Sequence, residues 1–142
     1  DNLSAITLFA SLKVKDGKIE DAVKYIGSIV SKDEINKRNK KELQIILIAL
    51  YGQVKDIDNV IVVYKDLISQ YPENDNYLHR LAAIYANNGQ ISEAENLLLS
   101  SIDSDDNDSQ LAYVSFLDAY RSPDVATKKL EEFSAQSNKN GK

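Results

Sequence analysis

The sequence predicts an all-α protein built from repeated helical hairpins. In residues 76–108, apolar side chains recur every three or four positions in two runs, and Gly89 lies between the runs. This spacing places one buried stripe on each of two short helices. The same pattern recurs with a period of about 34 residues, for example from Tyr51 to Tyr85. A period of this length indicates helical units that bury their apolar faces by stacking on one another.

Taken in order, the apolar stripes predict seven or eight helices. Glu34–Lys41 is highly charged, so it is either a linker or an exposed extension of a helix. Pro72 is expected to end one helix, because proline lacks the N–H that a helix interior needs. Ser122 followed by Pro123 is typical of a helix start. From Ser134 onward the chain is polar and is expected to fray. The apolar stripes of the expected helices lie within residues 3–14, 19–30, 42–52, 57–68, 78–85, 91–102, 111–120 and 125–133.

Composition excludes several classes of protein. The net charge of −5 and the pI near 4.9 argue against nucleic acid and anionic membranes as partners, because both demand a basic surface. No apolar run approaches the roughly 20 residues of a membrane-spanning helix, and no cysteine is present. The absence of cysteine is compatible with a location in the cytoplasm or in the periplasm. The regular repeats fit a bacterial protein. Because the chain begins at Asp1, we expect a processed chain or a piece of a longer protein.

The repeat resembles the tetratricopeptide repeat. In residues 75–108 the resemblance depends on Leu81, Tyr85, Gly89 and Ala94, and in residues 41–74 on the corresponding apolar positions and Pro72. Lys55 occupies the turn position of that second unit where glycine is expected. The first unit, residues 3–36, keeps the turn glycine. The last pair, residues 109–136, is degenerate because its second helix begins about two residues early, and residues 137–142 form a polar tail.

The resemblance implies a single domain with the architecture of a right-handed α-solenoid. Small side chains such as Ala82 and Ala94 would let the helices of a unit approach closely, and Tyr85 would fill the space beneath the turn. Gly89 is expected in the left-handed backbone conformation. Terminal units are expected to present a more polar outer side.

No catalytic, cofactor or metal site is predicted. The one histidine, His79, lacks a nucleophile and an orienting carboxylate, so we interpret it as a surface or groove residue. Asp103–Asp108 resembles a calcium loop, but Asp108 replaces the required glycine and Val114 the required glutamate. Glycines are scattered singly, so no phosphate-binding loop exists. The sequence therefore predicts a protein that is not an enzyme.

The remaining functional candidate is a concave groove for a protein or peptide, lined by the first helix of each unit. Relatives that hold a peptide carboxylate use a lysine, asparagine and arginine clamp, of which only Arg80 matches, so this kind of partner is disfavoured. The first unit would contribute Ser4, Thr7 and Ser11. The main candidates are Glu42, Ile45, Ala49 and Gln53 in the second unit, and Asn76, His79, Arg80, Ala83 and Asn87 in the third.

Two functions follow from this surface. The first is a non-enzymatic scaffold that binds a protein or peptide segment in the groove. The second is an assembly module of a longer repeat protein, which associates through its ends or through the apolar run Val60–Val63. That run is apolar on every side, so it is expected to pack against the next unit or against a missing partner. The sequence does not identify the partner, the oligomeric state or the compartment.

Overall fold

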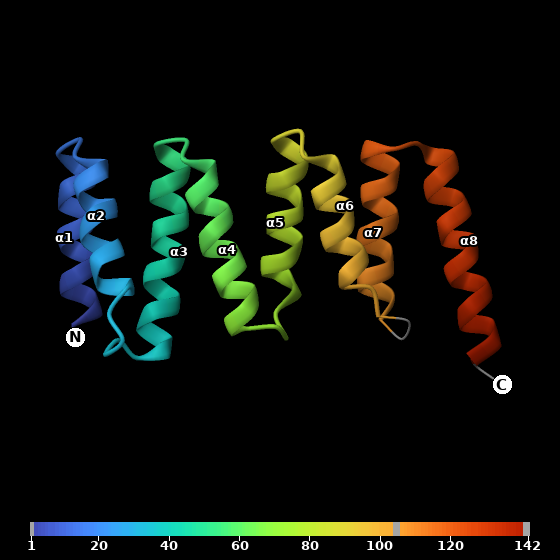
Figure 1. Ribbon diagram of the computed structural model, residues 1–142, viewed down its shortest axis with the longest axis horizontal. Helices are drawn as coiled ribbons and strands as arrows, with labels where there is room; N and C mark the ends of the chain where they lie inside the picture. Colours follow the sequence, from blue (N-terminus) through green and yellow to red (C-terminus); the bar gives the residue numbers. More distant parts are fainter. Residues whose placement is uncertain (1, 104–105, 141–142) are drawn as a thin grey trace. The chain divides into compact units, whose positions relative to one another are not determined.

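The structure, a computed structural model, describes residues 2–103 and 106–140. Within these ranges the chain forms eight α-helices and no strand, which confirms the predicted all-α class and helix number (Figure 1). The helices are α1 (Leu3–Lys15), α2 (Ile19–Val30), α3 (Lys37–Gln53), α4 (Ile57–Gln70), α5 (Asp75–Asn87), α6 (Ile91–Ser100), α7 (Asn107–Tyr120) and α8 (Pro123–Asn140).

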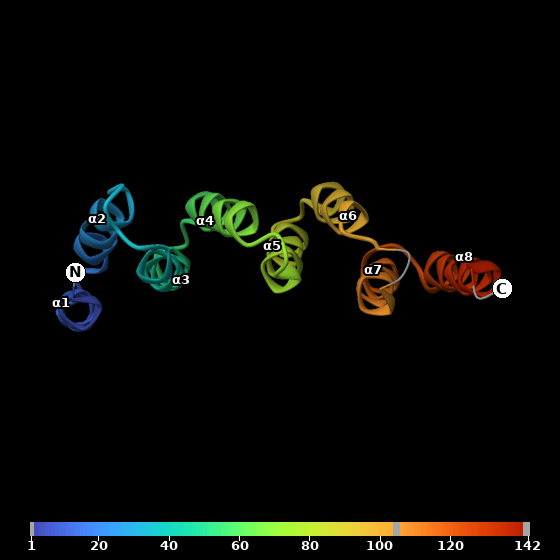
Figure 2. The same ribbon diagram turned by 90° about the horizontal axis from the view of Figure 1, so that it is seen from below.

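The helices form two compact units, Asp1–Pro72 and Glu73–Lys142. In the first unit α1 packs on α2, α2 on α3, and α3 on α4. The second unit repeats this order from α5 to α8. Within it, α5 and α7 lie on one side while α6 lies on the other, as Figure 2 shows. Because of this alternation, α5 and α7 are neighbours on the same side of the unit.

Each unit has its own apolar core. In the second unit the core comes from all four helices, and its most deeply buried member is Ala94, with no exposed surface. The complete burial of Ala94 agrees with the prediction that small side chains let the helices of a unit approach closely. A larger side chain there would hold the helices apart. In the first unit one buried cluster consists of Ile6, Ala10, Ala22, Ile26, Ile29, Ile35, Leu43, Leu47 and Leu50, and α4 adds the buried residues Val60, Ile61, Tyr64 and Leu67.

Short polar side chains start several of the helices. Asn36 accepts a hydrogen bond from the backbone N–H of Asn39 at 2.9 Å, and Asp56 caps α4 in the same way. Asp106 accepts from two N–H groups at the start of α7. The backbone N–H of Val125 donates to the Ser122 side chain, as predicted for α8. These caps satisfy N–H groups that have no partner within the helix.

Three hairpin turns share one hydrogen-bond pattern. At each, the residue after the turn donates its N–H to a carbonyl five residues earlier: Lys18 to Lys13, Asp56 to Tyr51, and Gln90 to Tyr85. This pattern requires a positive φ at the residue before the donor. Gly17 and Gly89 have φ values of 74° and 79°, which confirms the prediction for Gly89. Lys55 takes the same conformation with φ 59°.

Replacing Lys55 by glycine is expected to raise the free energy of unfolding by about 0.5 to 1 kcal/mol. A residue with a Cβ atom pays about 1 to 2 kcal/mol for the left-handed conformation, and the larger freedom of glycine in the unfolded chain offsets part of that gain. Urea denaturation measures the change. Gly17→Ala is the reciprocal control and is expected to destabilise, although an added Cβ there meets nothing within 4 Å. A loss of stability in Lys55→Gly would contradict the strain argument.

The structure decides several local predictions. Both alternatives for the charged stretch Glu34–Lys41 hold in part, because Lys37–Lys41 forms the exposed to half-buried start of α3 and the residues before it form a linker. The polar residues from Ser134 to Asn140 continue α8 as helix, and their expected fraying stays a prediction. In the apolar run Val60–Val63, Val60 and Ile61 are buried but Val62 is 60% exposed, so the chain does not cover every side of the run and packing of Val62 against a missing partner stays a prediction.

Two other predictions are not tested by the structure. The loop Asp103–Asp108 lies partly outside the described residues, so its resemblance to a calcium loop cannot be followed further. The extent of the single domain and of its repeat units also stays a prediction. The helix starts do keep the expected period between Ile57 and Ile91, whereas Pro123 begins α8 two positions earlier than the same period predicts.

Candidate functional site

The second unit contains an apolar groove between α5 and α7. Its volume is about 260 Å³. The floor consists mainly of small side chains, of which Ala82 and Ala86 are buried, and Leu98 of α6 closes it from below. The alanines and the serine in the lining leave room on this surface, because each extends little beyond its Cβ atom. The lining residues are His79, Ala82, Ala83, Ala86, Leu98, Ala112, Ser115, Phe116, Ala119 and Tyr120.

Two aromatic side chains line the α7 side of the groove. The ring centroids of Phe116 and Tyr120 are 5.1 Å apart, and the rings are tilted by 31°. Phe116 is buried, whereas Tyr120 is 41% exposed. The Tyr120 hydroxyl also lies 3.5 Å from the Asn87 side-chain oxygen, to which it donates. An exposed aromatic ring held in place by its neighbours is a surface on which an apolar group can pack.

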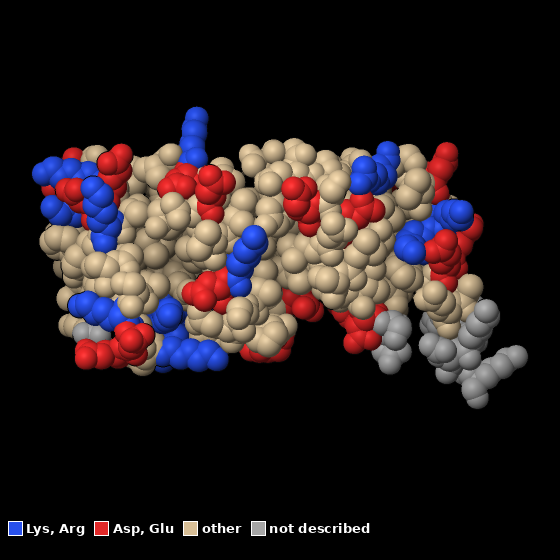
Figure 3. All heavy atoms as spheres, viewed as in Figure 1, with Lys and Arg blue, Asp and Glu red and all other residues tan. Residues whose placement is uncertain are grey.

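A larger polar pocket lies at the start of the same two helices. Its volume is about 680 Å³. Its lining is strongly acidic, and no Lys or Arg lines it among the residues that the structure describes. On the face seen in Figure 3, carboxylates also gather at the lower edge of this unit, where α5 and α7 begin. The lining residues are Glu73, Asn74, Asp75, Asn76, His79, Asp106, Asp108 and Ser109.

The four carboxylates of this acidic pocket differ in what they do. Asp106 is the N-cap of α7, and its oxygens accept from the N–H groups of Asp108 and Ser109 at 3.0 and 3.1 Å. Glu73, Asp75 and Asp108 are exposed and form no ion pair within the described chain. Asp75 and Asp108 lie in the first turns of their helices, where the helix dipole favours a negative charge. The dipoles therefore help to keep these unpaired carboxylates together.

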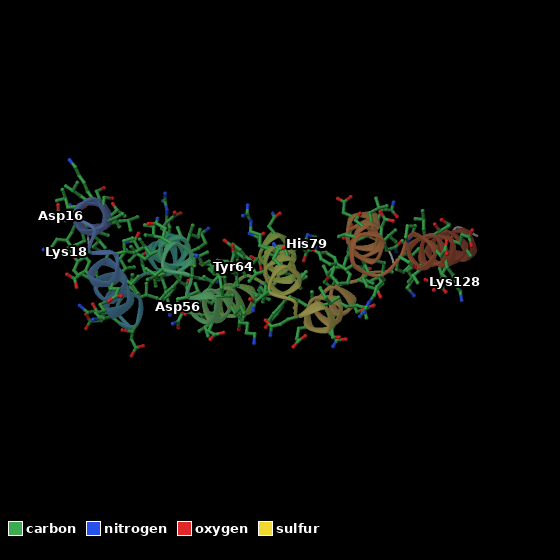
Figure 4. All side chains as sticks on the ribbon, turned by 90° about the horizontal axis from the view of Figure 1, so that it is seen from above. Asp16, Lys18, Asp56, Tyr64, His79 and Lys128 are labelled. Carbon is green, nitrogen blue, oxygen red and sulfur yellow. The ribbon has the colours of Figure 1, made fainter. Side chains whose placement is uncertain are left out.

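His79 belongs to both the apolar groove and the acidic pocket. It lies on α5, on the side toward α7 (Figure 4). Its Nε2 atom is buried and has no hydrogen-bond partner among the described residues. The two cavities therefore meet at this side chain, and the imidazole there is not fixed by a hydrogen bond through Nε2.

A polar network joins α6 to α7 behind the groove. The buried Tyr113 donates its hydroxyl proton to Glu95 at 3.1 Å, and Arg121 forms an ion pair with the other oxygen of the same carboxylate. Burial, and then the hydrogen bond to Glu95, raises the pKa of Tyr113. The network fixes the end of α7 to α6 and so positions the α7 wall of the groove.

The structure places the predicted groove residues in different surroundings. His79 and Ala83 line the apolar groove, while Asn76 lines the acidic pocket. Asn87 contacts the groove through Tyr120. Arg80 is exposed on α5 but lines neither cavity. The candidates Glu42, Ile45, Ala49 and Gln53 share one exposed face of α3.

Sequence reasoning missed the α7 wall and the acidic pocket. The sequence predicts a degenerate repeat at residues 109–136, and none of the α7 residues is among the predicted groove residues. The period offers a signal, because Ala86 and Ala119 are separated by nearly one repeat and both line the groove. The acidic pocket had no comparable signal, since Glu73 and Asp108 come from distant loops and helix starts.

Two other kinds of feature are not found in residues 2–103 and 106–140. Among the residues that the structure describes, no group of three or more His, Cys, Asp or Glu side chains has an arrangement suited to a metal ion. In the same ranges, no helix has the length and apolar character needed to cross a membrane.

Helical hairpins at a regular spacing, with a groove along their first helices, define a class of helical repeat proteins. The family model described as tetratricopeptide repeat matches residues 53–114. This match, together with the structural neighbours, confirms the resemblance to the tetratricopeptide repeat family. Proteins of that family generally mediate protein–protein interaction and are generally not enzymes. No curated protein sequence matches the chain significantly.

Solved structures show the same fold at low sequence identity. The chain is similar to nearly identical tetratricopeptide-like repeats from a Podosopora anserina protein of the kinesin light chain type, with a TM-score of 0.62 and 19% identity. That match covers 97% of this chain and 76% of the other. A match to MamA has a TM-score of 0.59 and 15% identity, and covers 99% of this chain and 81% of MamA. The fold is therefore that of tetratricopeptide repeat solenoids.

Proposed function

We propose that this protein is a non-enzymatic scaffold that binds a protein or peptide segment in the groove between α5 and α7. The observation that carries the proposal is the groove itself, about 260 Å³ with a floor of alanines beside an exposed Tyr120. Small side chains on both walls let a peptide approach the helices closely, and the aromatic ring offers apolar contact area. His79, Ala83 and Asn87 are the predicted residues that contact the partner.

The charge of the site argues against an acidic tail as the partner. A peptide carboxylate would need basic groups, but the described residues that line the groove and the acidic pocket include no Lys or Arg. Like charges at an interface are repulsive and disfavour such a partner. Arg80, which alone matched the carboxylate clamp, lies outside both cavities.

Filling the groove is expected to abolish binding. Ala83→Trp places a large ring in the groove, and because Ala83 is exposed, the fold should tolerate it. The measurement is selection from a displayed library of random short peptides, followed by affinity measurement on synthetic copies of the enriched sequences. We expect the wild-type chain to enrich peptides whose affinity falls at least tenfold, about 1.4 kcal/mol, in Ala83→Trp.

The matched control is Leu99→Trp on α6. Leu99 is 43% exposed and does not line the groove, so this variant is expected to bind like the wild type. Thermal denaturation of both variants checks that each remains folded. Failure to enrich any peptide, or equal binding by both variants, would overturn the groove as the binding site.

The assembly role has one observation in its favour. Leu8 and Leu12 of α1 are 62% and 52% exposed, on the face opposite the buried Ile6 and Ala10. A terminal repeat was expected to be more polar here, and adjacent apolar side chains left in water favour association. Light scattering tests this role: mass should rise with concentration in the wild type and stay monomeric when both leucines are replaced by serine.

A further inference from the structure

The apolar groove and the acidic pocket are neighbouring parts of one surface. His79 lines both cavities, and both run along the same two helices, α5 and α7. The groove takes apolar groups, whereas the pocket at the helix starts is lined by carboxylates. A single chain segment lying along the helices would meet both.

The electrostatic character of this surface is one-sided. Glu73, Asp75 and Asp108 are exposed, and their carboxylates form no ion pair with any described residue. Elsewhere in the same unit Glu95 and Glu132 each pair with a basic side chain. Several unpaired carboxylates around one cavity repel one another, and a cationic group placed among them relieves that repulsion.

We propose that the groove selects a peptide segment that carries Lys or Arg next to small apolar or aromatic residues. The basic side chain enters the acidic pocket, and the apolar residues lie over the alanines and against Tyr120. This inference depends on the proposed function and specifies the chemistry of the partner. Arginine and lysine suit the pocket because their long stems can cross the His79 side chain while the charged head reaches the carboxylates.

The composition of the enriched peptides is the first test. The displayed library of random short peptides is expected to give sequences with a Lys or Arg at a constant distance from an apolar or aromatic residue. In synthetic copies, replacing that basic residue by norleucine should lower affinity about tenfold or more. Affinity should also fall as salt concentration rises, because the exposed carboxylates are screened.

The second test removes the charge from the protein. The triple variant Glu73→Gln, Asp75→Asn, Asp108→Asn is expected to lose about tenfold in affinity for the basic peptides and to bind the norleucine copies unchanged. Asp106 is left in place because it caps α7. The control variant Glu93→Gln, Asp118→Asn, Glu131→Gln makes the same change in net charge at exposed positions outside both cavities, and should keep wild-type affinity.

Arg80 supplies a further check. It adds a positive charge to α5 outside both cavities, so Arg80→Glu is expected to leave binding of a basic peptide unchanged or to strengthen it. Weaker binding in this variant would contradict the inference.

The outcomes separate the inference from the function on which it depends. If peptides are enriched and are lost in Ala83→Trp, but contain no basic residue or bind both triple variants equally, the basic partner is refuted and the groove stands. If no peptide depends on Ala83, both the groove and the basic partner are refuted.

Discussion

Replacing Tyr85 by alanine is expected to lower the free energy of unfolding by about 3 to 5 kcal/mol. Tyr85 is 9% exposed and lies one turn before Gly89, so its ring fills the core of the second unit where α5 turns into α6. Removing a large buried ring loses its transfer free energy and leaves a cavity that the surrounding helices cannot close completely. Urea denaturation followed by far-UV circular dichroism measures the loss.

Two controls isolate the contribution of the Tyr85 ring. Tyr85→Phe keeps the ring, so its cost should stay below about 1.5 kcal/mol. Tyr120→Ala removes an aromatic ring that is 41% exposed, and should cost about 1 kcal/mol. If Tyr85→Ala costs no more than Tyr120→Ala, the assignment of Tyr85 to the core of its unit is wrong.

Local patterns made most of the helices predictable. A helix needs apolar residues on one stripe and suitable end residues, and both are written within a short stretch of sequence. Ser122 and Pro123 therefore predicted the start of α8 correctly. The turn at Gly89 was equally predictable from the sequence, because few residues other than glycine adopt its φ of 79° without strain.

The candidate site was less predictable because it depends on tertiary structure. Periodicity identified the exposed face of α5, including His79 and Ala83, but could not say which flank of that face has a neighbour. The groove lies on the side of α5 that faces α7. Ala83 lines the groove there, whereas Arg80 does not. The acidic pocket brings Glu73 to Asp108, and only the packing of α5, α6 and α7 places them together.

The first unit offers a comparison between a buried residue and an exposed candidate on one helix. Leu43→Ala is expected to cost about 2 to 5 kcal/mol, because Leu43 has no exposed surface and lies in the core. Ile45, two residues later, is 43% exposed on the opposite face of α3. Ile45→Ala is therefore expected to change stability by no more than about 0.5 kcal/mol.

The same pair of variants tests whether α3 takes part in binding. Leu43→Ala should change denaturation far more than peptide affinity measured under conditions where the variant is folded. Ile45→Ala should leave denaturation unchanged, and a loss of peptide affinity in it would add the exposed face of α3 to the binding surface. Equal destabilisation by the two variants would contradict the packing of α3, because positions i and i+2 of a helix point to different faces.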